Sequence, residues 1–168
     1  MQHSALRHPA PPAPARLWLV ALCGLLLLAA PARAAPDGVA TTPSHHGLRE
    51  TLDRFEAAVR AAGWVVFTEI DHAAAATAVG MQLRPRTVVL FGNPRAGTPG
   101  MAETPTLALD LPMRVLVWQD DAGAIQVTRS TGTDLAQRLF ARHGVVIPPT
   151  QQAATEAFLA GLVARAAE

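Results

Sequence analysis

An apolar run near the N-terminus determines how much of this 168-residue chain is available to fold as a domain. Arg7 and Arg16 precede a stretch of fourteen apolar or small residues, Leu17–Ala30, and Ala32–Ala34 (ARA) follows it. A basic lead, a short apolar core and an A-x-A exit are the features of a secretory signal peptide. The run is shorter than the roughly 20 residues that a membrane-crossing helix needs. We therefore expect residues 1–34 to be a cleaved signal peptide, with an uncleaved anchor as the alternative.

Cleavage after residue 34 would leave 134 residues, enough for one domain, in the periplasm or outside the cell. This part contains eleven Arg, no Lys and thirteen acidic residues, a net charge of −2 with His neutral, which disfavours nucleic-acid binding. The single Cys, Cys23, lies in the signal segment, so a disulfide framework and a CxxC redox centre are excluded. Membrane contact is expected only through an uncleaved signal segment.

Apolar spacing and turn residues predict nine elements in the order helix, strand, helix, strand, helix, strand, strand, helix, helix. We expect them at residues 48–62, 64–70, 72–79, 87–91, 98–107, 113–118, 124–130, 134–143 and 151–166. This order is typical of an α+β fold. It predicts one domain over 48–147, with a four-stranded mixed sheet packed against helices. A linker over 35–47 would precede the domain, and a C-terminal helix over 148–168 would follow it.

Several residues indicate where these elements begin and end. Gly63 is expected to end the first helix, and Asp71 to cap the short helix that follows it. The strand at 87–91 (TVVLF) is apolar almost throughout, as expected for a strand covered on both faces. Thr98 followed by Pro99 is typical of a helix N-cap and first residue, so a helix is expected to start there.

The loop at residues 92–100 (GNPRAGTPG) is the leading candidate for a binding site. A strand that runs through such a loop into a helix exposes backbone N–H groups and the positive end of the helix dipole. Asn93, Arg95 and Thr98 could then hold a small anion, with Arg95 supplying a bidentate fork for a carboxylate or phosphate. The alternative is a tight turn in which these residues serve the backbone geometry.

Glu69, Asp71 and His72 form a second polar cluster, at the end of the first strand. A carboxylate and an imidazole in this position could bind a metal ion or act as acid and base. The alternative is structural: Asp71 is a helix N-cap and His72 is a residue of the first turn. No HExxH pattern, no His pair at helical spacing and no G-x-S-x-G pattern occurs, so a zinc hydrolase and a serine hydrolase are disfavoured.

With these segments placed, residues 48–131 resemble the bacterial domain of unknown function 302 family. The resemblance rests on blocks in the family's order: Ala62-Gly63 at the end of the first helix, residues 66–72 (VFTEIDH), 91–99 (FGNPRAGTP), 109–112 (LDLP) and 115–118 (VLVW). It implies an α+β domain from a bacterium, often with an export signal. It implies no activity, because the family's biochemical role is unsettled.

These observations lead to two main hypotheses. The first is a non-enzymatic module that binds a small anion or a protein partner through the loop from Asn93 to Thr98. The second is a small periplasmic enzyme or metal-binding protein that uses Glu69, Asp71 and His72, and it requires these side chains to line one pocket with the loop. In a third hypothesis, the edge of the apolar hairpin at 113–130 pairs two copies into a homodimer. No residue is assigned as catalytic or as a metal ligand, and the cofactor is left open.

Overall fold

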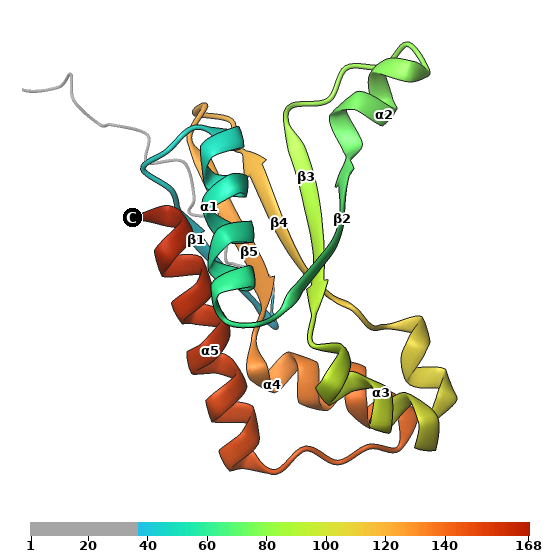
Figure 1. Ribbon diagram of the computed structural model, residues 1–168. Coiled ribbons are helices and arrows are strands. Elements are labelled where there is room, and N and C mark those ends of the chain that lie inside the picture. The colour runs from blue at the N-terminus through green and yellow to red at the C-terminus, as the bar shows by residue number, and fades with distance from the viewer. Residues whose placement is uncertain (1–36) are drawn as a thin grey trace, which may run out of the picture. The chain divides into compact units, whose positions relative to one another are not determined.

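A computed structural model describes residues 37–168, which form one antiparallel sheet with helices on one face and at both ends (Figure 1). The five strands lie in the order β1-β5-β4-β3-β2, and every neighbouring pair is antiparallel. They are β1 (Val39–Pro43), β2 (Val65–Asp71), β3 (Arg86–Gly92), β4 (Met113–Gln119) and β5 (Ile125–Ser130). The α+β class is confirmed, whereas the expected four-stranded mixed sheet is wrong. The expected signal peptide lies outside the described residues.

The fifth strand, β1, lies within the segment that the sequence indicated as a linker. It pairs with β5 from Val39 opposite Ser130 to Pro43 opposite Gln126, and the hydroxyls of Thr41 and Thr128 are 2.8 Å apart. The segment carries no alternating apolar pattern because backbone hydrogen bonds to a single neighbour hold it in place. Pro43 fits this position, since an edge strand does not need every N–H for the ladder.

Two helices, α1 (Leu48–Ala61) and α5 (Pro149–Ala167), cover one face of the sheet (Figure 1). In β3, the side chains of Val89 and Phe91 are buried against this layer, whereas Val88 and Leu90 on the opposite face are only partly buried. The expectation that this strand is covered on both faces is therefore wrong. Side chains from both helices and from the three strands β3, β4 and β5 form the core. Its members include Leu52, Phe55, Val59, Val89, Phe91, Val115, Val117, Val127, Leu159, Leu162 and Val163.

The remaining helices lie at the two ends of the sheet (Figure 1). At one end, α2 (His72–Ala78) follows β2. At the other end lie α3 (Pro94–Glu103), the 3-10 turn η1 (Pro105–Leu109) and one continuous helical segment made of α4 (Gly132–Asp134), η2 (Leu135–Phe140) and η3 (Ala141–His143).

The start of α3 corrects an expectation from the sequence. The helix begins at Pro94, because Asn93 accepts a hydrogen bond from the N–H of Arg95 at 3.0 Å and acts as the N-cap. Thr98 is therefore not the cap, and Pro99 lies inside the helix. The Gly63 expectation is confirmed: this residue follows the α1 C-cap with φ +77°, a conformation that glycine adopts without strain.

An ion pair between a buried Arg and a partly exposed Glu fastens α5 to the sheet and to α4. Arg129 of β5, whose side chain is 7% exposed, donates two hydrogen bonds to Glu156 of α5, at 2.6 and 3.0 Å. The same carboxylate accepts a hydrogen bond from the N–H of Gly132 at 2.7 Å. The hydrogen bond from Arg129 is the main reason why the pKa of Glu156 lies below its ordinary value.

This geometry predicts that Glu156→Ala lowers the free energy of unfolding by about 3 kcal/mol, because the buried Arg129 guanidinium loses its carboxylate and keeps only the carbonyl oxygen of Ser130. Urea unfolding followed by circular dichroism measures the change. Glu103→Ala, at an exposed position of α3, is the matched control and should change stability by less than about 0.5 kcal/mol.

The double variant Arg129→Met/Glu156→Leu should recover most of the loss, since it removes the buried charge together with its partner. A double variant no more stable than Glu156→Ala would contradict the role of the pair. Because the pKa of folded Glu156 is lowered, its contribution is complete above the ordinary value of 4.5 and is lost as the pH falls through the lowered value.

Candidate functional site

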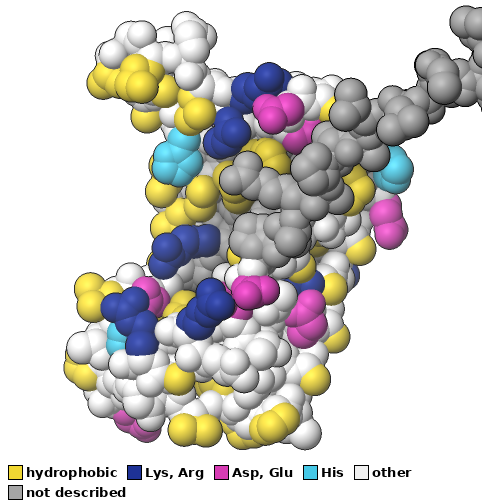
Figure 2. All heavy atoms as spheres, turned by 180° about the vertical axis from the view of Figure 1, so that it is seen from behind, with side chains coloured by type: hydrophobic (Ala, Val, Ile, Leu, Met, Phe, Trp, Pro, Cys, Tyr) yellow, Lys and Arg dark blue, Asp and Glu magenta, His cyan; other side chains and the backbone are white. Residues whose placement is uncertain are grey.

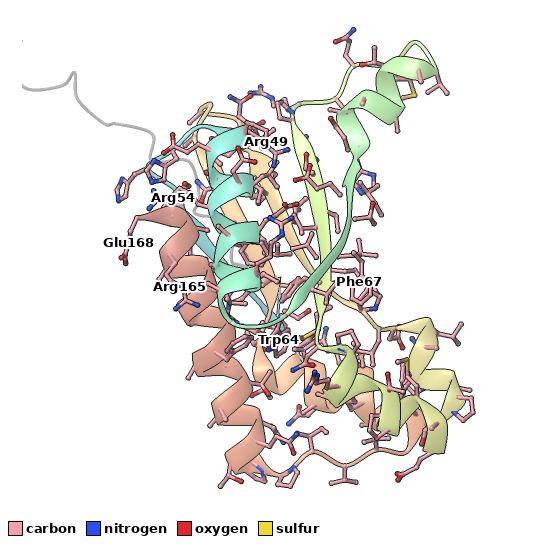
Figure 3. All side chains as sticks on the ribbon, in the orientation of Figure 1. Arg49, Arg54, Trp64, Phe67, Arg165 and Glu168 are labelled. Carbon is pink, nitrogen blue, oxygen red and sulfur yellow. The ribbon has the colours of Figure 1, made fainter. Side chains whose placement is uncertain are left out.

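Glu69, the first of the residues proposed from the sequence, forms an ion pair between β2 and α1. Arg49, labelled in Figure 3, reaches from the first turn of α1 and donates hydrogen bonds of 2.7 and 2.9 Å to the two carboxylate oxygens of Glu69. The same guanidinium lies 2.8 Å from Asp53. These hydrogen bonds lower the pKa of Glu69 and raise that of Arg49. Glu69 therefore ties a strand to a helix.

Asp71 and His72 lie at the start of a helix, as the structural alternative to a catalytic or metal-binding role expected. The Asp71 carboxylate accepts hydrogen bonds from the N–H groups of Ala73 and Ala74, at 2.9 and 3.0 Å, and so caps α2. His72 is the first residue of this helix and is exposed. Helix capping accounts for the Asp at this place.

The loop residues do not gather around a common point. Asn93 caps α3, Arg95 is exposed and Thr98 is exposed on the same helix. Within residues 37–168, the Arg95 side chain forms no ion pair. The sequence thus identified a helix start here, but placed its N-cap five residues too late.

The register of β2 and β3 separates the two groups of residues. Asp71 lies opposite Thr87, whereas Gly92, which precedes Asn93, lies opposite Val65. Five residues of β3 span about 17 Å, so the two groups are at opposite ends of the strand pair. The condition that the enzyme hypothesis set, one pocket lined by both groups, is not met in the described part of the chain.

A cavity of about 190 Å³ lies where the ends of three strands meet the helical segment that follows β5. Its apolar wall comes from the end of β3, the start of β4, η2 and α5. Its polar groups are Asp110 before β4, Arg114 in β4 and Ser130 at the end of β5. The lining consists of Phe91, Asp110, Met113, Arg114, Ser130, Leu135, Leu139 and Leu159.

Asp110 connects this cavity to a buried polar cluster. One of its carboxylate oxygens lies 2.7 Å from Nε2 of His143, whose side chain is only 4% exposed, and 3.2 Å from the Arg142 guanidinium. Nδ1 of His143 lies 2.9 Å from the hydroxyl of Thr106. The hydrogen bond with His143 is the main cause of a lowered Asp110 pKa, and Arg142 adds to it.

The protonation of the cluster follows from these contacts. An ionised Asp110 can only accept, so Nε2 of His143 carries the proton of the bond between them. In the neutral ring Nδ1 is then the acceptor for the Thr106 hydroxyl. The three side chains thus link η1, the residue after it and η3, and they hold the helical wall beside the cavity.

This site was not predicted from the sequence. There, His143 is the last residue of an expected helix, and 109–112 is one block of the family resemblance. Asp110 and His143 are 33 residues apart, so no local spacing connects them. The only sequence signals for this cluster were a single His before Gly144 and an acidic residue in a distant turn. Nothing in the sequence indicates that the two are in contact.

Among residues 37–168, no three His, Cys, Asp or Glu side chains gather in a way that could hold a metal ion. In the same range, none of the helices combines the length and apolarity that crossing a bilayer requires.

Comparison with known proteins identifies the family of this fold. The family model described as "Domain of unknown function DUF302" matches residues 40–160. The chain belongs to the DUF302 family. A solved structure, the uncharacterized conserved protein DUF302 from Bacillus stearothermophilus, superimposes with a TM-score of 0.64 at 17% identity, over 78% of this chain and 99% of that one. At this identity the match supports the fold alone.

The DUF302 chain is also similar to curated proteins with another description. It is 41% identical over 102 residues to fluoride-specific ion channel FluC 1 of Brucella suis, which covers 61% of this chain and 40% of that protein. The same identity and length hold for FluC 2 of Brucella melitensis, with 38% of that protein covered. The DUF302 chain therefore spans about two fifths of the length of these relatives.

The polar cluster predicts a local effect of Asp110→Ala. Removal of the carboxylate leaves the buried Nε2–H of His143 without its partner, so hydrogen exchange in residues 135–143 should accelerate by about tenfold or more. Exchange followed by mass spectrometry measures this. Asp121→Ala, at a fully exposed carboxylate, is the control and should leave the segment unchanged.

Unchanged exchange in Asp110→Ala would show that the cluster does not hold the helical wall. The same contact should weaken in acid. Since the pKa of folded Asp110 is lowered, the contact is complete above the ordinary value of 3.8 and is lost as the pH falls through the lowered value.

Proposed function

We propose that this DUF302 domain is a binding module for a small amphipathic anion, which it holds in the cavity between the strand ends and the helical segment. The proposal assigns no reaction to the domain. One observation carries it: a single opening combines an apolar wall with an exposed Arg114. This places the binding site beside the loop from Asn93 to Thr98, which follows the same end of β3, and not on the loop itself.

The apolar wall sets the first property of the ligand. Phe91, Leu135 and Leu159 are buried core residues at the bottom of the cavity, and Met113 and Leu139 are partly buried around them. A cavity of about 150 Å³ lined by such side chains is large enough for benzene. A cavity of about 190 Å³ therefore fits one aromatic ring or a short alkyl chain.

The charges beside the opening set the second property. The Asp110 carboxylate is engaged by His143 and Arg142, so its charge is largely compensated. Arg114 donates one hydrogen bond, to the carbonyl oxygen of Asp110 at 3.2 Å, and forms no ion pair within the described residues. A guanidinium has five N–H donors and matches a carboxylate in a bidentate geometry. Figure 2 shows Arg side chains beside acidic ones where the sheet meets the lower helices.

The ligand class that combines both properties is a short carboxylate with an apolar body. Hexanoate and benzoate represent it, and their binding to the protein can be measured by ligand-observed NMR and calorimetry. Hexylammonium is the matched probe of opposite charge, and we expect it to bind more weakly than hexanoate because it would face Arg114.

The binding proposal predicts distinct effects for two variants. Arg114→Gln should weaken hexanoate binding by about tenfold or more, since a charge-assisted hydrogen bond is lost. Leu139→Trp should weaken hexanoate and benzoate alike, because the larger side chain fills the cavity. Arg84→Gln, at an exposed Arg that binds the Asp120 and Asp121 region, is the control and should bind as the wild type does. Equal binding by all three variants, or none by the wild type at millimolar probe, would overturn the proposal.

We further propose that the domain works after export, as residues 1–34 suggest. Expression of the full-length gene in a Gram-negative bacterium should yield a periplasmic polypeptide that begins at Ala35, as intact-mass measurement would show. Replacement of Ala32 and Ala34 by Arg removes the small residues that a signal peptidase needs, and should leave the precursor uncleaved. A wild-type polypeptide of the full 17.7 kDa in the cytoplasm would contradict export.

A further inference from the structure

Exposed apolar side chains gather on one edge of the domain, along β2 and the segment that follows α2. Phe67 is 53% exposed, Val79 72% and Met81 64%, and three neighbours are exposed to a similar or smaller extent. We call the set the apolar edge, and it consists of Val65, Phe67, Ile70, Val79, Met81 and Leu83. In Figure 3 Phe67 lies on the outer side of β2, away from α1. Figure 2 shows hydrophobic side chains at the tip of the part that projects from the sheet.

The backbone along this edge is suited to pairing. In the described part of the chain β2 pairs only with β3, and its sequence VVFTEID contains neither Lys nor Pro, two residues that commonly protect edge strands. A bulge between Val66 and Thr68 places Phe67 outside the register with β3. Because bulges protect edge strands, the apolar side chains and not the backbone alone must carry the contact. Edge strands with exposed apolar residues are templates for another strand.

The arm formed by α2 and residues 79–85 is only slightly covered in the domain, with Ala73, Ala76 and Pro85 partly buried. The helix contains no buried residue, and it projects beyond the end of the sheet (Figure 1). Val79 and Gly80 form the turn that ends the helix, and in the segment after it Met81 and Leu83 alternate with Gln82 and Arg84. This alternation is typical of an extended chain with one face against another surface. Within a single domain that surface is missing from the described residues.

We propose that the apolar edge is a self-association surface, on which a second copy of this chain pairs antiparallel along β2 about a twofold axis. This inference does not depend on the cavity or its ligand. It also replaces the edge expected from the sequence: the hairpin of β4 and β5 lies between β3 and β1 and offers no edge.

The geometry of the edge favours a second copy as the occupant. In an antiparallel pair, the Asp71 end of one β2 lies beside the Val65 end of the other. The arm begins directly after Asp71, so each arm would extend over the start of the partner's β2, near its Val65 and Phe67. The arm of each chain thus covers the β2 side chains of the other, which is the reciprocal contact that a twofold axis requires.

The charges of β2 are compatible with this arrangement. The Glu69 carboxylate is already paired with Arg49 through two hydrogen bonds, so two approaching strands do not bring uncompensated acids together. The two Asp71 side chains are at opposite ends of an antiparallel pair, and each is engaged as a helix cap. A parallel pair would place them side by side.

The test compares the wild type with four variants, each expressed from the full-length gene. The mass of the single polypeptide is measured in the same preparation, so that the mass in solution can be expressed as a number of copies. Phe67→Glu alters the strand part of the apolar edge and Met81→Glu the arm. Leu109→Glu and Val146→Glu are matched controls, because these side chains are 73% and 87% exposed elsewhere. Light scattering after size exclusion and sedimentation velocity give the mass in solution, and thermal unfolding shows whether each variant is folded.

We expect the wild type and both controls to have twice the polypeptide mass at micromolar concentration. Phe67→Glu and Met81→Glu should each weaken association by about a hundredfold or more, since each charge enters the contact twice. Met81 lies on an arm without buried residues, so its variant tests the contact even if Phe67→Glu fails to fold. A monomeric wild type, or a dimer unaffected by Met81→Glu, would overturn the proposal and leave the edge to a different protein.

Discussion

The ion pair of the buried Arg129 with Glu156 is the interaction on which the arrangement of this domain depends. Arg129 occupies a position of β5 that alternation directs toward the helices, in line with the buried Val127 and Ile125. A guanidinium at such a place requires a carboxylate, because an uncompensated buried charge costs several kcal/mol. Glu156 supplies it, and its second function as acceptor for the N–H of Gly132 brings α4 against α5.

The close approach of α4 and α5 depends on glycine at position 132. A Cβ at this residue would come within 2.9 Å of the Glu156 backbone nitrogen, closer than such atoms pack. One polar interaction and one small residue therefore fix the origin of the helical segment that follows. Leu135 and Leu139 extend from that origin along the cavity, and Leu159 of α5 faces them. The cavity is thus a consequence of how the chain satisfies a buried Arg.

Sequence reasoning succeeded where a signal is local. The apolar stripe of α1, the cap at Asp71 and the hairpin of β4 and β5 each depend on residues close together in the chain, and each is found near its expected place. The start of α3 shows the limit of such signals. Asn93-Pro94 and Thr98-Pro99 have the same cap-and-proline pattern, and the chain uses the first, where Asn93 directly follows β3.

What the sequence did not provide is information about pairing. Strand β1 lacks an apolar period because its stability comes from the backbone of β5, and the antiparallel order depends on neighbours that no single segment specifies. The cluster beside the cavity was not predicted from the sequence for the same reason. Asp110 and His143 are ordinary residues of a turn and a helix end until the fold places them 2.7 Å apart. The residues that the sequence singled out, Glu69 and Asp71, instead satisfy an Arg and a helix terminus.

The apolar edge and the cavity meet at one point of the structure, which bears on how binding and association relate. A Cβ at Gly92 would lie 3.5 Å from the Phe67 ring and 3.6 Å from Pro112, so both side chains pack over this glycine. The neighbours of these positions, Phe91 and Met113, line the cavity. Phe67 therefore rests on the backbone that carries one rim of the cavity, whereas the arm lies at the far end of β3. In the proposed dimer the partner's arm would lie near this same Phe67, so association and the rim of the cavity share one side chain, and a change at Phe67 acts on both.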